Sequence, residues 1–390
     1  MERKFSWKRF LLRSLSYVLV AVVASYVTLM LFGQPYSKLT ELESIIDRAF
    51  IGEYDKDTIE DMAAEAMVYG LGDRWSMYLT AEEYSAYMES ASNSFVGIGV
   101  TVTHREDNTG EDVLSVTEGG PAQAAGILPG DAIIKVDGQS LVGVDTSGAK
   151  AMIVGEEGTT VEITVLRNGE EMAFTIERQR IKVKVASGEM LANNIGLVRI
   201  ENFNEGCGEE AIAAIEALRQ QGATALIFDV RFNPGGYVNE LIKVLDHLLP
   251  EGVLFREVDY RGVEGTRRSD ADCLEMPMAV LVNGDSYSAA EFFAACLREY
   301  DWATIVGEQT CGKGYYQNTI RLSDGSAVNL SIGKYFTPNG VSLTEAGGVT
   351  PDVVETVDDE TAMKIYAGTI EPENDPQLQL AIKAVTEKTG

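Results

Sequence analysis

Apolar extended segments alternate with amphipathic helical segments from about residue 195 onward. IGLVRIENF is typical of a strand and GEEAIAAIEALRQQ of a helix. They are followed by the buried strand TALIFDVR, the helix YVNELIKVLDHLL and the strand MAVLVNG. Neighbouring parallel strands need a crossover connection, which is usually a helix. This order therefore predicts a layered α/β core with a partly parallel sheet.

Two differently patterned regions precede this core. Residues 36–93 carry apolar side chains at helical spacing in KLTELESIIDRAF and DTIEDMAAEAMVYGL, which predicts a helical region. Residues 94–180 contain short alternating runs separated by turn residues, with one helical stretch over residues 146–155. They predict a compact β-rich module. Strands over ATIVGE, YYQNTIRL and AVNLSIGKYF, and a helix over residues 374–388, are expected near the end of the chain.

The N-terminus has the charge pattern of a membrane anchor. Residues 1–14 carry five basic side chains against one glutamate, and residues 15–32 carry no charge. An uncharged run of this length is about the minimum for a span, and basic residues favour the cytoplasmic side. We therefore expect a cytoplasmic basic tail, an uncleaved single-pass anchor and an extracytoplasmic body. The net charge of −28 disfavours nucleic acid as a partner.

The stretch GDSYSAAEFFAACLREY, residues 284–300, places Ser286 and Ser288 at a turn that enters a helix. The free N–H groups at a helix N-terminus can stabilise a developing negative charge, so this is a suitable position for a nucleophile. A serine also needs a base. The chain has only two histidines, His104 and His247, and neither lies in a recognisable motif, so a Ser-His-Asp triad is disfavoured.

A lysine is the alternative base. Lys313 lies between two glycines in GEQTCGKGYYQ, away from the charged helix faces that carry most other lysines. A neutral amine can accept the serine proton when burial lowers its pKa from about 10.4. The turn in DVRFNPGG, residues 229–236, could supply backbone donors for an oxyanion. Phosphate-loop signatures and metal-binding cysteine spacings are absent, so no cofactor and no metal are expected.

These features together resemble the carboxyl-terminal processing proteases, also called tail-specific proteases, which are Ser/Lys-dyad peptidases of family S41 with a PDZ domain. The resemblance rests on NPGG, on Ser-x-x-Glu, on Gly-Lys-Gly-x-x-x-Gln, and on a PDZ-like loop and GGPAQAAGILPGDAIIKVDG at residues 119–138. It implies a PDZ-like domain over 94–180, an α/β, crotonase-like serine protease core over 181–356, and a C-terminal tail with a helix over 357–390.

The resemblance also implies roles for individual residues. Ser288 would be the nucleophile, Lys313 its base, and Gln317 the residue that orients the lysine. The oxyanion donors would be the N–H of Ala289 and that of Gly235 or Gly236. The PDZ loop that receives a peptide carboxylate would be Val96, Gly97, Ile98, Gly99 and Val100. The chain departs from the family at Tyr287, where a small residue is usual, and at Cys311, where phenylalanine is usual.

The expected function is that of a membrane-anchored serine endopeptidase in a bacterial cell membrane. Its PDZ-like domain would capture exposed C-terminal tails of proteins or peptides and present them to the Ser-Lys dyad for cleavage through an acyl-enzyme. The helical region would pair two copies into a homodimer, as the resemblance implies. The alternative is a catalytically inactive adaptor that binds peptides through the PDZ-like domain.

Overall fold

The computed structural model describes residues 7–32 and 37–389, and the chain divides into two compact units. The first unit extends to Ala63 and contains α1 (Trp7–Phe32), α2 (Ser37–Ala49) and the first half of α3 (Lys56–Tyr69). The second begins at Ala64 and contains all strands of the described chain. Each unit is described separately below.

The expected membrane anchor over residues 15–32 forms part of α1. Across the described ranges, however, no helix combines the length and the apolar character that crossing a membrane requires. The structure therefore does not support the transmembrane helix that the sequence predicted. Residues 1–6 of the predicted basic tail lie outside the described part of the chain.

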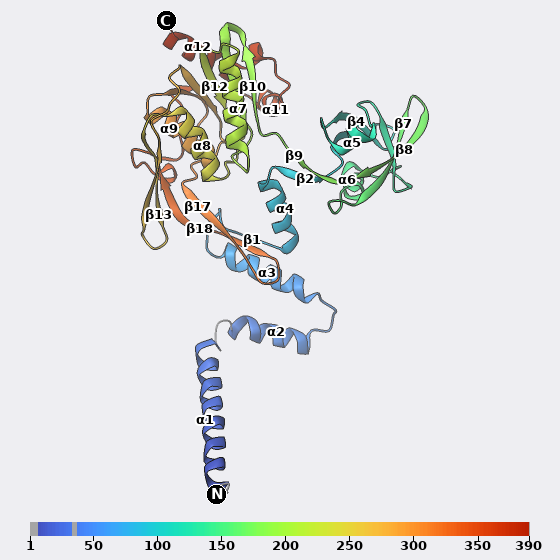
Figure 1. Cartoon of the computed structure of the whole chain (residues 1–390), viewed down its shortest axis with the longest axis vertical. Coiled ribbons are helices and arrows are strands. Elements are labelled where there is room, and N and C mark those ends of the chain that lie inside the picture. Colours follow the sequence, from blue (N-terminus) through green and yellow to red (C-terminus); the bar gives the residue numbers. More distant parts are fainter. Residues whose placement is uncertain (1–6, 33–36, 390) are drawn as a thin grey trace, which may run out of the picture. The chain divides into compact units, whose positions relative to one another are not determined.

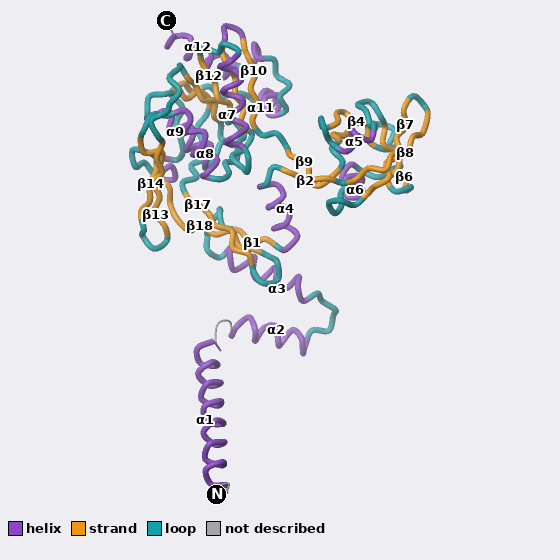
Figure 2. Tube along the Cα trace, in the orientation of Figure 1, coloured by secondary structure: helices purple, strands orange, loops and turns teal. Residues whose placement is uncertain are grey.

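The β-rich module of the second unit is visible as a group of strands with two short helices (Figures 1 and 2). One sheet has the order β3-β4-β5-β7-β8, with β6 paired to β5. Its strands are β3 (Val100–His104), β4 (Glu111–Val116), β5 (Ala132–Val136), β6 (Gln139–Ser140), β7 (Thr160–Arg167) and β8 (Glu170–Glu177). The helices are α5 (Pro121–Ala125) and α6 (Thr146–Ile153), the latter where the sequence predicted one.

A separate two-stranded ribbon joins the two ends of this module to the rest of the unit. It consists of β2 (Ser94–Gly97) and β9 (Gln179–Lys182), which pair antiparallel. Beside it, Asn93 and Asn202 exchange two side-chain hydrogen bonds of 3.1 and 3.0 Å. Asn93 has a φ of 47°, a left-handed conformation that asparagine tolerates better than most residues. The module therefore connects to the core through one short ribbon.

The α/β core contains the parallel component that the strand and helix alternation predicted. Its sheet has the order β10-β11-β12-β15-β16-β19, and every neighbouring pair from β11 onward is parallel. The strands are β10 (Ala186–Leu191), β11 (Ile195–Ile200), β12 (Ala225–Asp229), β15 (Met278–Val282), β16 (Ala303–Gly307) and β19 (Val353–Val354). The pairing of β10 with β11 is antiparallel and was not anticipated.

Helices cover both faces of this sheet because its buried strands are apolar on both sides. On one face, alternate residues such as Leu226 and Phe228 pack with α7 (Cys207–Gln220), α8 (Val238–Leu248) and α9 (Ala289–Glu299). On the other face, the intervening residues such as Ile227 pack with α12 (Pro376–Thr389). Because β12, β15 and β16 are parallel, the loops that follow these three strands leave the sheet at the same edge.

A second sheet completes the unit. Its order is β1-β18-β13-β14, with β17 also paired to β18. Its strands are β1 (Met77–Leu79), β13 (Gly252–Asp259), β14 (Glu264–Ser269), β17 (Tyr315–Arg321) and β18 (Ala327–Phe336). The short strand β1 and the following α4 (Ala81–Ala91) come from the region predicted to be helical. The remaining helices are α10 (Leu343–Ala346) and α11 (Asp359–Tyr366).

Candidate active site

Three loops that carry the predicted site residues leave adjacent parallel strands at the same edge of the core sheet. The NPGG turn follows β12, the serine turn follows β15, and the lysine loop follows β16. These strands are neighbours in the sheet and run in the same direction. The carboxyl ends of parallel strands form a common edge, which is where open α/β sheets place their ligand sites. The topology thus brings together segments about 80 residues apart along the chain.

The two candidate serines have different environments. Ser286 is fully buried, and its hydroxyl donates to the carbonyl of Val230 at 2.7 Å and accepts from the N–H of Asn283 at 3.1 Å. Ser286 therefore stabilises the turn. Ser288 is half-buried and lies immediately before the first residue of α9. Of the two, only Ser288 also lines the neighbouring cleft.

The backbone at Ser288 adopts an unusual conformation, with φ 56° and ψ −117°. Positive φ is uncommon for residues other than glycine, and such residues persist only where their surroundings fix them. Gly235 provides one of these constraints. A Cβ atom on Gly235 would lie 2.9 Å from the Cβ of Ser288 and 3.0 Å from the N of Ala289. The NPGG turn can approach the serine this closely only because residue 235 is glycine.

Glu291 joins the serine turn to the lysine loop. Its side chain is buried, and Oε2 accepts from the backbone N–H groups of Ser288 at 2.9 Å and Lys313 at 2.8 Å. Oε1 accepts from the hydroxyl of Thr310 at 2.6 Å and from the N–H of Gly312 at 2.7 Å. The sequence identified Glu291 as part of Ser-x-x-Glu, but not this set of four donors.

Lys313 lies in a largely water-excluded position. Burial lowers the pKa of its amine below the ordinary value, and the charge of Arg74 acts in the same direction. Cys311, Asp73 and Glu291 act against this shift. The net lowering increases the neutral fraction of the amine near neutral pH, and only the neutral amine can accept a proton.

Gln317 also lines the cleft, on β17. Its pairing with β18 shifts register between Tyr316 and Gln317, where a bulge or irregularity interrupts the ladder. The side-chain nitrogen of Gln317 donates to the carbonyl of Tyr315 at 3.2 Å and to the hydroxyl of Ser331 at 3.1 Å. These bonds orient the amide and leave its oxygen available as an acceptor.

The two glycines proposed as oxyanion donors differ in the hydrogen bonding of their N–H groups. The N–H of Gly235 donates to the side-chain oxygen of Asn233 at 2.8 Å, so it is already occupied. Within the described part of the chain, the N–H groups of Gly236 and Ala289 make no hydrogen bond. Asn233 also accepts at its carbonyl from the N–H of Tyr287 at 3.1 Å, which ties the NPGG turn to the serine turn.

Ser288, Lys313, Gln317, both glycines and Ala289 all line one cleft of about 620 Å³. Its walls include aromatic and apolar side chains from several elements, namely Tyr84, Tyr87 and Met88 of α4, Leu241 of α8, Phe255 of β13, Phe292 of α9 and Tyr335 of β18. Polar side chains such as Asn204, Asn318 and Asn329 also line it, so the cleft suits an extended peptide with both apolar side chains and a polar backbone.

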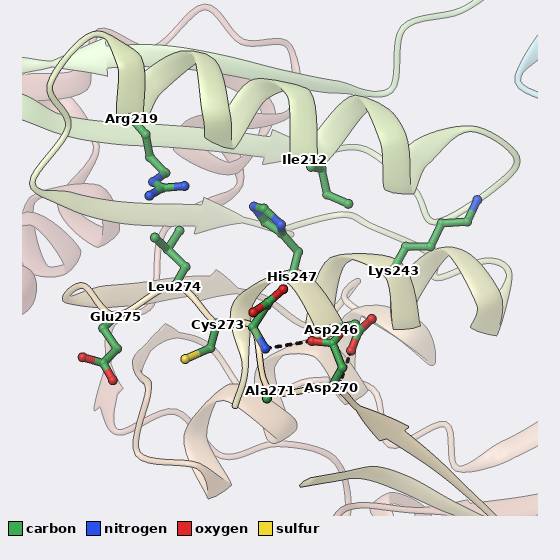
Figure 3. A pocket seen from close by; sticks show the side chains of 11 residues that line it. Ile212, Arg219, Lys243, Asp246, His247, Asp270, Ala271, Cys273, Leu274 and Glu275 are labelled. Carbon is green, nitrogen blue, oxygen red and sulfur yellow. Dashed lines mark hydrogen bonds between the residues drawn. The ribbon is translucent and has the colours of Figure 1, made fainter. Parts of the chain in front are cut away.

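A second hollow of about 940 Å³ lies between α7 and α8 and is bordered by residues 270–275 (Figure 3). Arg219, Lys243 and His247 line it, and each is paired with a glutamate, so no free cation marks it as an anion site. The predicted catalytic residues do not line it. His104 lies on β3 and bonds to Glu111 and Asn108. His247 lies on α8 and bonds to Glu216, and neither histidine makes a hydrogen bond to Ser288 in the described part of the chain.

The predicted PDZ loop, Val96 to Val100, comprises the last two residues of β2, the two residues that follow it and the first residue of β3. Gly99 has a φ of 79°, which favours glycine. The N–H groups of Ile98 and Gly99 are not donated to any group in the described ranges of the chain. Two successive free N–H groups can form a concave site for a carboxylate.

Trp75 is a cleft residue that the sequence did not indicate. Its ring lies beside Lys313 and Tyr287, although it is more than 200 residues from either along the chain. It reaches them because β1, two residues later, pairs with residues 327–329 of β18, and the hydroxyl of Ser76 accepts from the N–H of Ser331 further along β18. In the sequence, Trp75 lies shortly after the helical pattern that ends at residue 71, and this position carries no information about the pairing.

Comparisons with known proteins agree with this architecture. Residues 194–355 match the model of peptidase family S41, and residues 96–177 match a PDZ domain. The carboxy-terminal processing protease CtpA of Bacillus subtilis is 34% identical over 354 residues, with 86% of this chain and 75% of that protein covered. A probable CtpA-like serine protease of Staphylococcus aureus is 31% identical over 321 residues, with 81% and 64% covered.

A solved structure is also similar over most of its length. The photosystem II D1 C-terminal processing protease matches with a TM-score of 0.50 and 27% identity, covering 89% of this chain and 93% of that chain. Fold and matches together define a serine-type endopeptidase with a PDZ domain. The chain belongs to peptidase family S41 and is related to the carboxyl-terminal processing proteases.

Proposed function

We propose that Ser288 and Lys313 form the catalytic dyad of this endopeptidase. The observation that carries this proposal is the convergence of three loops on one cleft, with a strained serine at a helix N-terminus and a desolvated lysine in the same wall. Lys313 is the only lysine among the residues that line this cleft in the described chain, and no histidine lines it.

In the proposed reaction, the oxygen of Ser288 attacks the scissile carbonyl carbon while the neutral amine of Lys313 takes the hydroxyl proton. The N–H groups of Ala289 and Gly236 stabilise the oxyanion. The resulting ammonium gives its proton to the leaving amine as the peptide bond breaks. Water then attacks the ester while Lys313 accepts its proton. The bond between the acyl carbon and the oxygen of Ser288 breaks, and the ammonium returns the proton to that oxygen. The side-chain oxygen of Gln317, which lines the same cleft, would accept a hydrogen bond from the ammonium once it forms.

We propose that the PDZ domain selects the substrate. The free N–H groups of Ile98 and Gly99 suit the terminal carboxylate of an unstructured tail, and β3 offers a strand for main-chain pairing. The substrates are then proteins or peptides with exposed C-terminal tails. The B. subtilis and D1-processing relatives carry names that refer to processing at carboxyl termini, which is in accord with this proposal.

The location of the catalytic body outside the cytoplasm also stays a proposal. It rests on the basic residues before position 15 and on the uncharged run over 15–32. A fusion of the first 40 residues to alkaline phosphatase, which is active only after export, tests it. Phosphatase activity supports an exported body, whereas activity of the matched fusion to a cytoplasm-dependent reporter contradicts it.

Labelling with a fluorophosphonate probe tests the dyad and separates it from the alternative of an inactive adaptor. The purified protein should become labelled at Ser288, located by peptide mass mapping. Ser288→Ala and Lys313→Ala should not be labelled, yet both should bind a tail peptide through the PDZ domain as the unmodified protein does. Unchanged labelling of either variant contradicts the dyad, and peptide binding without any labelling of the unmodified protein supports the adaptor.

A further inference from the structure

The amine of Lys313 lies against an aromatic ring. Nζ is 4.7 Å from the centroid of the Trp75 ring. Within residues 7–32 and 37–389, Nζ makes no hydrogen bond and no ion pair. A buried ammonium would require a hydrogen-bonded or anionic partner. A half-buried amine whose identified neighbour is an indole face is better suited to the neutral state.

Several contacts hold Trp75 in this place. The backbone N–H of Trp75 donates to the carboxylate of Asp73 at 3.1 Å, and the hydroxyl of Ser76 donates to the same carboxylate at 2.6 Å. The hydroxyl of Ser76 also accepts from the N–H of Ser331 at 3.0 Å, which fixes this turn to β18. The Trp75 ring is 6.5 Å from that of Tyr287. The backbone next to Trp75 is thus bonded to the sheet that carries Gln317, and the ring itself lies beside Tyr287 of the serine turn.

We propose that Trp75 is a positioning residue for Lys313, whose indole ring excludes water from the amine, and that Tyr287 supports this ring. The inference rests on the proposed function, because the amine needs to be neutral only if Lys313 is the base. It also gives Tyr287 a role. A small residue at position 287, which the family resemblance led us to expect, would leave the indole without this neighbour.

Two effects of the ring oppose each other. The negative face of an indole attracts an ammonium, which favours the protonated amine by an amount equivalent to roughly one pKa unit. Exclusion of water favours the neutral amine by up to roughly 3–5 units for a fully buried group. Lys313 is half-buried, so the full effect does not apply to it, but its pKa is lowered with burial as the largest cause, which indicates that exclusion outweighs the attraction.

The charged and titratable groups around the amine do not by themselves explain its lowered pKa. Arg74 favours the neutral amine, whereas Asp73, Glu291 and Cys311 favour the protonated one. Arg74 stacks on the Trp75 ring, with its guanidinium carbon 4.2 Å from the ring centroid, and donates to the sulfur of Cys311 at 3.4 Å. It therefore also helps to hold the Trp75 ring against the lysine loop. Burial remains the largest cause of the lowered pKa of Lys313.

The pH dependence of fluorophosphonate labelling tests this inference without a peptide substrate. In the unmodified protein, the labelling rate should rise with pH as Lys313 loses its proton. Trp75→Ala should admit water, raise the pKa of Lys313 and move this rise upward by about one unit. Labelling at pH 7 should then fall about tenfold and recover at higher pH. Trp75→Phe, which keeps an aromatic cover, should shift less.

Tyr260→Ala is the control. Tyr260 is exposed in the turn between β13 and β14 and does not line the cleft, so the pH at which labelling rises should not move. A Trp75→Ala variant that binds tail peptide normally but keeps the original pH profile contradicts the role of Trp75 and leaves the dyad intact. A shift to lower pH also contradicts it, because attraction of the ammonium would then dominate. Normal labelling of Lys313→Ala contradicts the dyad and this inference together.

Discussion

The backbone N–H groups of Ser288 and Lys313 donate to the same oxygen atom, Oε2 of Glu291, at 2.9 and 2.8 Å. The proposed nucleophile and the proposed base are thus positioned through one buried carboxylate. The serine turn and the lysine loop follow different strands, so without this link their separation would depend on loop packing alone. The hydrogen bonds of Glu291 hold the serine turn and the lysine loop in a fixed position relative to each other.

Replacement of Glu291 by glutamine should therefore affect activity more than stability. One of its two oxygens becomes an NH₂ group, which faces N–H donors and leaves them without a partner. We expect a loss of about 1–3 kcal/mol in the free energy of unfolding. The labelling rate at Ser288 should fall at least tenfold, because the dyad geometry is lost. Urea denaturation and labelling kinetics measure the two effects.

Glu299→Gln provides a control on the same helix. Glu299 accepts from the hydroxyl of Thr337 at 2.6 Å and from the N–H of Asn339 at 2.8 Å, so its carboxylate also joins a helix to a loop. Its substitution should lower stability to a similar extent without slowing the labelling of Ser288. If both variants label at the rate of the unmodified protein, Glu291 does not position the dyad.

Gly235→Ala should abolish labelling. The added Cβ would meet the Cβ of Ser288 at 2.9 Å, and the residue has a φ of +91°. Gly222 offers a close comparison, because its φ is +95° but no atom lies within 4 Å of an added Cβ. Both alanine variants should lose about 1–2 kcal/mol of stability through backbone strain. Only Gly235→Ala should lose labelling, and equal labelling of the two would contradict the proposed packing of this turn on Ser288.

The local features of the site were predictable from the sequence because they depend on short segments. The serine turn, the NPGG turn and the Gly-Lys-Gly turn are each defined within about ten residues, and the alternation of strands and helices predicts that they share one sheet. The contacts of Trp75 were not predictable. They depend on the pairing of a three-residue strand, β1, with β18, about 250 residues away. Such a short strand has no periodicity to detect.

The hydrogen bonds of individual N–H groups could not be predicted from the sequence either. Gly235 and Gly236 were equivalent candidates for the oxyanion site. The structure distinguishes them only because Asn233 turns its side-chain oxygen toward Gly235. Similarly, Glu291 was recognised from a motif, but its four donors come from two segments separated by about 20 residues. Backbone geometry at this level follows from tertiary packing, not from residue type.

The PDZ domain contains a histidine whose titration can be followed separately. Hydrogen bonds to Glu111 and Asn108 raise the pKa of His104 above its ordinary value. A raised pKa stabilises the fold below the unfolded value of about 6.5, and this contribution is lost as pH rises through the folded value. The imidazole signals in NMR spectra should show the raised pKa. Glu111→Gln should return it toward 6.5, and an unchanged pKa would contradict the role of Glu111.

The C-terminal segment stabilises the loop that carries the oxyanion turn. Arg231, two residues after β12, is buried and forms ion pairs with Asp229 at 2.6 Å and with Asp375 at 2.9 Å. Gln377 of α12 accepts from the same guanidinium at 3.0 Å. Asp375→Asn should leave Arg231 undercompensated and cost on the order of 3 kcal/mol, because breaking a buried pair is expensive. Labelling of Ser288 should fall as the loop loosens.

The pH dependence of stability should report the same cluster. Burial alone would raise the pKa of Asp229, but the charge of Arg231 more than offsets this and lowers it. The stabilisation from ionised Asp229 is therefore complete above its unfolded pKa of about 3.9 and is lost as pH falls through the lower folded value. Urea denaturation of the unmodified protein and of Asp375→Asn at pH 7 and at about pH 3, below the unfolded pKa, measures both effects. Glu360→Gln breaks only an exposed pair with Lys364, so it should change stability by less than about 0.5 kcal/mol. If Asp375→Asn costs no more than this control, the C-terminal segment does not stabilise the Arg231 cluster.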